Sequence, residues 1–380
     1  MKFIKFKRLM LFNLLARSLL LATSLLLAIS SAPAFAQEEK VLNFYNWANY
    51  VGEDTIKNFE KETGIKVRSD FFDNTETMHA KLVVGHSNYD IVITSGQWGG
   101  IEVKGDLLRK LDKTKLPNLS NMDPIMQAKL AKIDPNNEHL VSWLWGYTTV
   151  GINVDKVKKA LGVIPTPDNA FDLVFNPKYA AKLKSCGISF VDTPTDIFAV
   201  SLHYLGKNAY STNKADYEEV ANMLKKIRPY VAKFDSISYI DEMSRGTYCV
   251  ALGWSGDINI ARQSAIDAKN GQHIEALIPK IGAPLIFDAM AIPKDAPHPN
   301  NALLFMNYIM RPEVQAGLTN KVFYANSNTA SKHYVAKEII ENKTAFLADA
   351  DLKRMVAPDL LSNDIRHVMT RLYTKFKAGL

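Results

Sequence analysis

The sequence lacks the motifs that mark the common nucleophile and phosphate sites. Along its 380 residues there is no G-x-S-x-G elbow, no G-x-x-x-x-G-K-[ST] loop and no G-x-G-x-x-G turn after a strand. It also has no internal repeat, heptad run or low-complexity tract. These absences give no support to a serine hydrolase or a nucleotide-dependent enzyme, and no cofactor or metal site is indicated.

Cysteine is scarce. Only Cys186 and Cys249 are present, and neither has an obvious catalytic histidine partner. In an oxidising compartment an even pair is a candidate disulfide. The alternative is two unpaired buried thiols.

One uninterrupted apolar run stands out, at the start of the chain. Residues 18–30 are apolar, basic residues precede them, and Ala34-Phe35-Ala36 supplies a small-x-small cleavage pattern. The run is shorter than the ~20 residues of a membrane span, and no cysteine follows it for a lipid anchor. We therefore expect residues 1–36 to be a cleaved signal peptide, and the mature protein to be soluble in a bacterial periplasm.

The basic balance belongs mostly to this leader. The chain has 46 Lys+Arg against 39 Asp+Glu, but five basic residues and no acidic ones lie in residues 1–36. The remainder carries 41 basic against 39 acidic residues, a net charge of +2, which does not argue for nucleic acid as a partner. Its 344 residues (380 less 36) exceed the ~250–300 at which single cores usually split. Two domains are expected. No Gly/Ser/Pro-rich linker separates them, so the chain is expected to cross between them more than once.

The first part of the mature chain predicts alternating strands and helices. The expected order is strand 41–45, helix 51–64, strand 65–72, helix 74–85 and strand 89–96. Such a β-α-β-α-β order predicts a parallel sheet covered on both faces. A second α/β region is expected from about residue 147, with these apolar runs and helical stripes: 186–192, 215–231, 249–257, 273–280, 285–293 and 302–310.

Polar or aromatic clusters follow several of the expected strands. They read FYNWANY, ITSGQW, FVDTPTD, LGWSGD, LIFDAM and VFYANSN. In open α/β sheets, ligands bind outside the carboxyl ends of the strands. We expect the six clusters to converge on one cleft between two lobes.

The clusters combine aromatic and acidic side chains without any lysine or arginine. Their main members are Trp47, Tyr50, Trp254, Tyr324, Asp196, Asp257 and Asp288. Carboxylates pair with ammonium groups, and aromatic faces hold cations and methylenes. This indicates a ligand that is cationic at its ends and apolar between. A sugar is the alternative ligand, Asp257 could serve only as a turn residue, and Trp254 could be core packing.

Several segments of the chain together resemble a known family. The segments that carry the resemblance are NFYNWANYV, NFEKETGIKV, LDKTKLPN, NVDKVK, KLKSCGISFVD, GWSGD, MNYIMRPEV and VFYANSN. They resemble the periplasmic putrescine- and spermidine-binding proteins of polyamine ABC transporters, above all the putrescine-binding members. The resemblance covers nearly the whole mature chain in order.

The resemblance implies a two-lobed α/β fold of the type II periplasmic binding proteins, each lobe a mainly parallel sheet flanked by helices. Lobe 1 would comprise residues 37–146 plus 281–322, and lobe 2 residues 147–280 plus 323–380. It implies a monomer that catalyses nothing, captures a polyamine and delivers it to an inner-membrane ABC permease. A sensor or interaction protein with an altered site on the same fold is the alternative.

The resemblance also implies the site. Trp47, Tyr50, Trp254 and Tyr324 match an aromatic box, and Ser95 matches a polar contact. Asp288 matches the acid for one ammonium end, while Asp196 and Asp257 match acids around the other. Cys186 and Cys249 match a disulfide pair.

Five positions depart from the family pattern. Ala48-Asn49 stands where Ser-Asp is usual, Asp196 where Glu is usual, Ile286 where an aromatic is usual, and Gln97 where Ser is common. Asn49 and Ile286 are counted with the ligand-binding positions. One acid is lost and room is gained, so we hypothesise a ligand other than putrescine, either longer (spermidine, agmatine or cadaverine) or less charged.

Overall fold

The computed structural model describes residues 38–48, 50–72 and 75–380. By its internal contacts the chain divides into residues 1–39 and residues 40–380, and the description below concerns the second unit. The expected signal peptide lies outside the described residues. Among the helices that the structure describes, none combines the length and apolar character needed to cross a membrane.

The predicted β-α-β-α-β order is confirmed near the start of this unit. Strand β1 (Val41–Trp47) lies between β2 (Lys66–Phe72) and β3 (Ile91–Ser95) and runs parallel to both. Helices α2 (Thr55–Thr63) and α3 (Thr75–Val84) make the two crossovers. Gly64 ends α2 in the left-handed conformation that glycine adopts readily, as its position after the helical stripe predicts.

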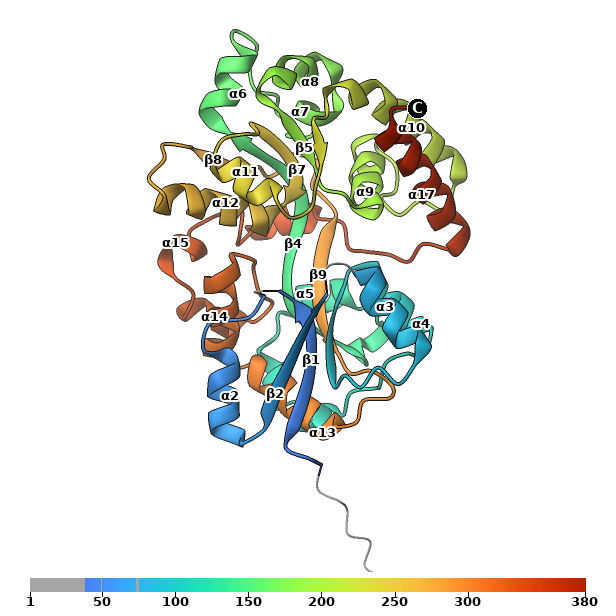
Figure 1. The fold of residues 1–380 in the computed structure, drawn as a ribbon, viewed down its shortest axis with the longest axis vertical. Coiled ribbons are helices and arrows are strands. Elements are labelled where there is room, and N and C mark those ends of the chain that lie inside the picture. Colours follow the sequence, from blue (N-terminus) through green and yellow to red (C-terminus); the bar gives the residue numbers. More distant parts are fainter. Residues whose placement is uncertain (1–37, 49, 73–74) are drawn as a thin grey trace, which may run out of the picture. The chain divides into compact units, whose positions relative to one another are not determined.

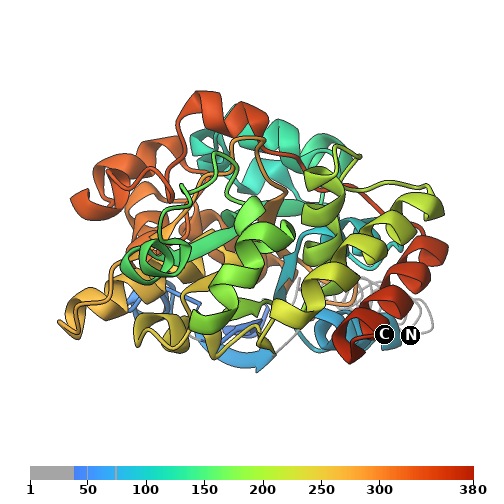
Figure 2. The same ribbon diagram turned by 90° about the horizontal axis from the view of Figure 1, so that it is seen from above.

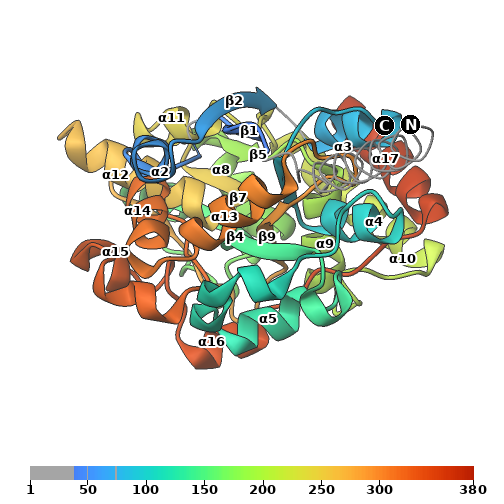
Figure 3. The same cartoon turned by 90° about the horizontal axis from the view of Figure 1, so that it is seen from below.

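Both faces of β1 are buried. Phe44 contacts Phe305 at 5.3 Å on one face, and Tyr45 stacks on Tyr89 at 4.3 Å on the other. Phe59 of α2 packs with Phe305 at 5.0 Å, whereas Met78 of α3 belongs to the cluster around Tyr45. Seen from below, α2 and α14 lie to one side of these strands and α3 and α4 to the other (Figure 3).

A long central strand carries the chain from one part of the sheet to the next. β4 (Leu140–Asn153) is buried along all 14 residues. It pairs antiparallel with β9 (Leu285–Ala291), and toward its end with β7 (Val250–Trp254) and β8 (Ile274–Ala276). In Figure 1, β4 and β9 run between the lower and upper groups of helices. The predicted lobe boundary at residues 146/147 falls inside β4, and the boundaries stay a prediction.

The strand order is β2-β1-β3-β9-β4-β7-β5-β6, with β8 paired to β4. β5 (Ile188–Phe190) is parallel to β7 and to β6 (Lys233–Phe234). In the described part of the chain, every antiparallel pair includes β4 or β9. The strands at each end of the sheet are therefore parallel to one another. In its middle, β9 and β4 each run antiparallel to both neighbouring strands.

Helices α9 (Pro194–Tyr204), α10 (Lys214–Ile227) and α17 (Asn363–Ala378) pack together beside β5 and β6 (Figure 2). Phe376 of α17 lies 5.2 Å from Phe234 of β6. The other helices are α4 (Gln97–Lys104), α5 (Pro124–Leu130), α6 (Val154–Leu161), α7 (Asp172–Phe175), α8 (Pro177–Leu183), α11 (Tyr239–Ser244), α12 (Ser255–Asp267), α13 (Pro299–Ile309), α14 (Pro312–Val322), α15 (Lys337–Ile340) and α16 (Asp349–Arg354).

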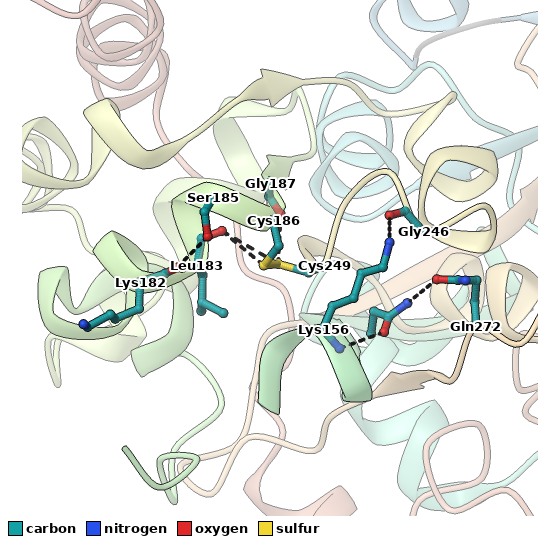
Figure 4. The surroundings of a disulfide bond; sticks show 10 residues. Lys156, Lys182, Leu183, Ser185, Cys186, Gly187, Gly246, Cys249 and Gln272 are labelled. Atoms are coloured by element: carbon teal, nitrogen blue, oxygen red, sulfur yellow. Dashed lines mark hydrogen bonds between the residues drawn. A yellow bond between two sulfur atoms is a disulfide. The ribbon is translucent and has the colours of Figure 1, made fainter. Parts of the chain in front are cut away.

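The predicted disulfide is present. Cys186 and Cys249 are bonded, with their Cα atoms 5.4 Å apart and a sequence separation of 63 (Figure 4). Cys186 precedes β5 and Cys249 precedes β7, so the bond ties together the starts of two neighbouring parallel strands.

Candidate functional site

Asp288 lies in the middle of β9 and not beyond its end, so the cluster LIFDAM does not follow a strand as expected. It faces Ser95 across the β3–β9 pair, and the Ser95 hydroxyl donates to its Oδ1. The Tyr50 hydroxyl donates to Oδ2 at 2.8 Å. Asp288 is 8 % exposed, and no basic side chain of the described residues forms an ion pair with it. It is a buried acid held by hydroxyls alone.

Asp257 has the same kind of surroundings. It sits in the first turn of α12, directly after β7. The Tyr324 hydroxyl donates to its Oδ1 at 2.6 Å and the Tyr239 hydroxyl to its Oδ2 at 3.0 Å. Asp257 is also 8 % exposed. It is therefore more than a turn residue.

Asp196 lies in the first turn of α9, which begins at Pro194. The Thr193 hydroxyl donates to its Oδ2 at 2.7 Å. Thr148 and Trp254, which face one another across the β4–β7 pair, also lie near this carboxylate and stabilise its ionised form. Burial is nevertheless the larger effect and raises the pKa of Asp196.

The four predicted aromatic residues share one buried cluster, and three of them, Tyr50, Tyr324 and Trp254, lie beside an acid. The rings of Tyr50 and Tyr324 meet edge to face with centroids 5.8 Å apart. Trp47 packs on Phe72 at 4.4 Å, and both it and Trp254 lie against the same buried cluster as Tyr50. No described residue accepts a direct hydrogen bond from the indole N–H of Trp254. Trp254 therefore lies beside the Asp196 carboxylate and also packs against the buried cluster, and core packing stays the alternative interpretation.

Neighbouring acids add to the pKa shifts that burial causes at Asp257 and Asp288. Burial raises the pKa of Asp257 and of Asp288 to about 6, although the hydroxyl donors act in the opposite direction. The Asp288 charge adds to the shift of Asp257, and the Asp196 charge adds to that of Asp288. A cation placed among the three acids would offset both the cost of burying their charges and the repulsion between them.

The hydroxyl groups themselves stay protonated. Burial, followed by the nearby carboxylates, raises the pKa of Tyr50, Tyr324 and Tyr239 well above its ordinary value. Each tyrosine can therefore donate a hydrogen bond to an acid at any physiological pH. In the described ranges, no group of three or more His, Cys, Asp or Glu side chains is arranged to hold a metal ion.

The remaining predicted positions differ. Asn49 lies outside the described residues. Ile286 is half-buried in β9, opposite Gly146, two residues before Asp288 and hence on the same face of the strand. Residues 322–328 do not end a strand but follow α14, with Ala325 bridged to Trp145 of β4.

Tyr239, Thr193 and Thr148 also lie at the acids, but they were not among the site residues predicted from the sequence. Tyr239 opens α11, 18 positions before the acid it contacts, and no local pattern marks it. Thr148 lies inside an apolar run for which no strand was expected. Thr193 had a detectable signal, because it precedes Pro194 and the helical pattern that follows.

A fold of this kind, with buried acids and aromatic side chains grouped near the strands that pass through its middle, is that of a solute-binding protein. The model of the bacterial extracellular solute-binding protein family matches residues 54–348, and the chain belongs to this family. The two-lobed type II fold is confirmed.

Relatives match along nearly their whole length. A putrescine-binding periplasmic protein of Pseudomonas aeruginosa is 42 % identical over 91 % of this chain and 94 % of its own. A putrescine-binding periplasmic protein of Escherichia coli is 41 % identical over 92 % of this chain and 94 % of its own. A solved spermidine/putrescine ABC transporter substrate-binding protein of Streptococcus pneumoniae has the same fold, with a TM-score of 0.75, 24 % identity, and 90 % and 99 % of the two chains covered.

Proposed function

We propose that the protein binds a polyamine between Asp288 and Asp257 and delivers it to an ABC permease. The observation that carries the proposal is a pair of buried carboxylates, each held by two hydroxyl donors and by no basic side chain of the described residues. A buried charge without a counter-ion is costly, so the site is built for a ligand that supplies positive charge.

The chemistry fits an alkyl chain with ammonium ends. A carboxylate oxygen has two lone pairs, so an oxygen that accepts one hydroxyl can still accept an ammonium N–H. The edge-to-face rings of Tyr50 and Tyr324 join the surroundings of the two acids. The tryptophans Trp47 and Trp254 offer faces for methylene groups and for charge. We assign the Asp288 end to one ammonium, and the Asp257 and Asp196 end to the other.

The relatives' names support the transport role. Two proteins more than 40 % identical to this chain are putrescine-binding periplasmic proteins. We propose the same compartment here, reached by export with residues 1–36 as the signal, and an inner-membrane ABC permease as the receiving partner. The proposal assigns no catalysis and no cofactor, and it takes the protein to act as a monomer. Nothing in the described site favours a sensor or adhesin instead.

Closure of the lobes is part of the proposal. Tyr50 and Asp288 belong to the predicted lobe 1, and Tyr324 and Asp257 to lobe 2. The two acids therefore reach one ligand together only when the lobes meet. The predicted boundaries, 37–146 plus 281–322 and 147–280 plus 323–380, place β4 and β9 at the passage between them.

Within the polyamine class we propose a ligand longer or less charged than putrescine. Ala48, Asn49, Asp196 and Ile286 differ from the usual family residues, with one acid fewer and two shorter side chains. A direct test is native mass spectrometry of the protein purified from the periplasm without added ligand, followed by release and identification of the bound molecule. A released polyamine supports the proposal, and a sugar or an anion would overturn it.

A further inference from the structure

Both glycines of the segment GWSGD lie against a tyrosine that binds its aspartate. A Cβ atom at Gly253 would lie 2.7 Å from the hydroxyl oxygen of Tyr239. A Cβ atom at Gly256 would overlap the ring of Tyr324. These are the two tyrosines whose hydroxyl groups occupy the two oxygens of Asp257. The glycines therefore leave the space in which the donors of Asp257 sit.

Tyr239 makes two hydrogen bonds that fix the direction of its own proton. Its hydroxyl oxygen accepts the backbone N–H of Trp254 at 3.2 Å. Its hydrogen is then directed to Asp257 Oδ2 at 3.0 Å. The side chain is 1 % exposed, so water does not compete for either bond. Tyr239 thus connects the last residue of β7 to the acid in the first turn of α12.

We propose that Tyr239, seated by Gly253, is a positioning residue that keeps Asp257 ionised and aimed at the ligand's ammonium group. It acts through the acid and is not itself assigned a ligand contact. This inference rests on the proposed amine-binding function of the same site. Tyr239 lies outside the expected ligand set, yet on this inference it determines the affinity for the amine and the pH dependence of that affinity.

The charged and titratable groups around Asp257 support this assignment. Tyr239 from α11 and Tyr324 from the segment after α14 donate to the acid and favour its ionised form, while Asp288 from β9 disfavours that form. Tyr50 is coupled electrostatically to the same carboxylate. Asp196 lies close enough to influence Tyr239. No basic group of the described residues takes part, so the hydroxyl donors alone offset burial.

Removing one donor has a defined consequence. Without the Tyr239 hydroxyl, the pKa of Asp257 rises further, and a larger fraction of the acid is neutral near pH 7. A neutral acid does not pair with an ammonium group. The affinity should fall, and the pH at which binding is half lost should move upward. A residue with a purely structural role would lower stability and leave that pH unchanged.

The test compares Tyr239→Phe with Tyr308→Phe, the matched control. Tyr308 is also buried, and its hydroxyl donates to a backbone carbonyl, Thr55 O at 3.2 Å, on α13 away from the acids. Isothermal titration of a panel of putrescine, cadaverine, agmatine and spermidine from pH 5 to pH 8.5 identifies the tightest amine, which is then used with each variant. We expect Tyr239→Phe to bind about tenfold more weakly at pH 7.5. Its pH midpoint should rise by at least half a unit, and Tyr308→Phe should match the wild type.

An unchanged pH midpoint in a folded Tyr239→Phe protein would overturn the inference, with or without a change in affinity. If that variant does not fold, Gly253→Ala decides, because the added methyl displaces the same hydroxyl while the ring remains. A wild-type midpoint in Gly253→Ala then overturns the inference. A wild-type protein that binds no amine of the panel contradicts the proposed function itself and is distinguishable from either result.

Discussion

The rings of Tyr50 and Tyr324 meet edge to face at 5.8 Å, and each tyrosine donates its hydroxyl to a different acid. Tyr50 holds Asp288 and Tyr324 holds Asp257, so the two acids are connected through one aromatic contact. The same contact lies between the two predicted lobes. We therefore expect recognition of both ligand ends to be linked to closure of the lobes.

The Asp288 carboxylate should dominate recognition of one ammonium end. Replacing it by asparagine removes the charge and keeps the size, so binding of the preferred amine should weaken by ~1.5–3 kcal/mol, the scale of a hydrogen bond to a charged group. Titration calorimetry measures the change. Asp295→Asn is the control, because Asp295 is exposed and accepts from Ser87 N at 2.9 Å. Equal dissociation constants for Asp288→Asn and wild type would exclude this role.

Amine binding should release protons near pH 6. Asp257 and Asp288 have pKa values of about 6 when buried without a cation, and an ammonium partner lowers them. The ligand remains cationic throughout this range, so only the acids change. Affinity should be constant above about pH 7.5 and should fall as the pH drops through 6. Calorimetry at pH 6 in two buffers of different ionisation enthalpy gives the proton count, and a count of zero would refute the coupling.

Without ligand, closure should depend on pH. If the acids have ordinary pKa values of about 3.9 in an open form, burying each in its ionised state costs ~3 kcal/mol at pH 8 and close to nothing at pH 4. The pKa of each acid is higher in the closed form than in the open form. Closure is therefore favoured below pH 4, and this contribution to closure is lost as the pH rises through 6. Small-angle scattering should show a smaller radius of gyration for the ligand-free protein at pH 4.5 than at pH 8. Equal radii would contradict this.

The disulfide should contribute stability without shaping the site. A bond that closes a loop with a sequence separation of 63 residues is expected to stabilise the folded state by about 4 kcal/mol on loop entropy. The double variant Cys186→Ser, Cys249→Ser should therefore unfold at a lower denaturant concentration. Its amine affinity under native conditions should equal that of the wild type. A loss of affinity in the folded variant would show that the bond also positions the site.

Patterns within short stretches of the sequence predicted the helices and strands whose formation depends on nearby residues. The order of β1, α2, β2, α3 and β3 followed from residue periodicity and from glycine after a helix. These features depend on neighbours within a turn or two. β4 was not predicted, because a strand buried along its whole length shows no alternation of polar and apolar residues.

At the site, too, local patterns identified candidate residues but not the contacts that depend on the folded chain. Aromatic and acidic clusters marked Tyr50, Asp257 and Asp288 as candidates, and the resemblance to a family supplied their roles. The pairing of Ser95 with Asp288, 193 positions apart, depends on how β3 and β9 align in the sheet. Tyr239 is positioned by its fit against Gly253, which only the folded chain reveals.

If two buried acids recognise the ammonium ends of a polyamine, binding requires a charged amine at both ends of the ligand. The most direct measurement is titration calorimetry of ligand-stripped protein at pH 7.5 with putrescine, cadaverine, agmatine, spermidine and the neutral analogue 1,4-butanediol. We expect that at least one amine binds tightly, that an amine other than putrescine binds tightest, and that the diol does not bind. Tightest binding of putrescine would refute the hypothesis of a different ligand while leaving the polyamine class intact. If the diol bound as tightly as any amine, or if no amine bound, the two acids would not be the groups that recognise the ligand.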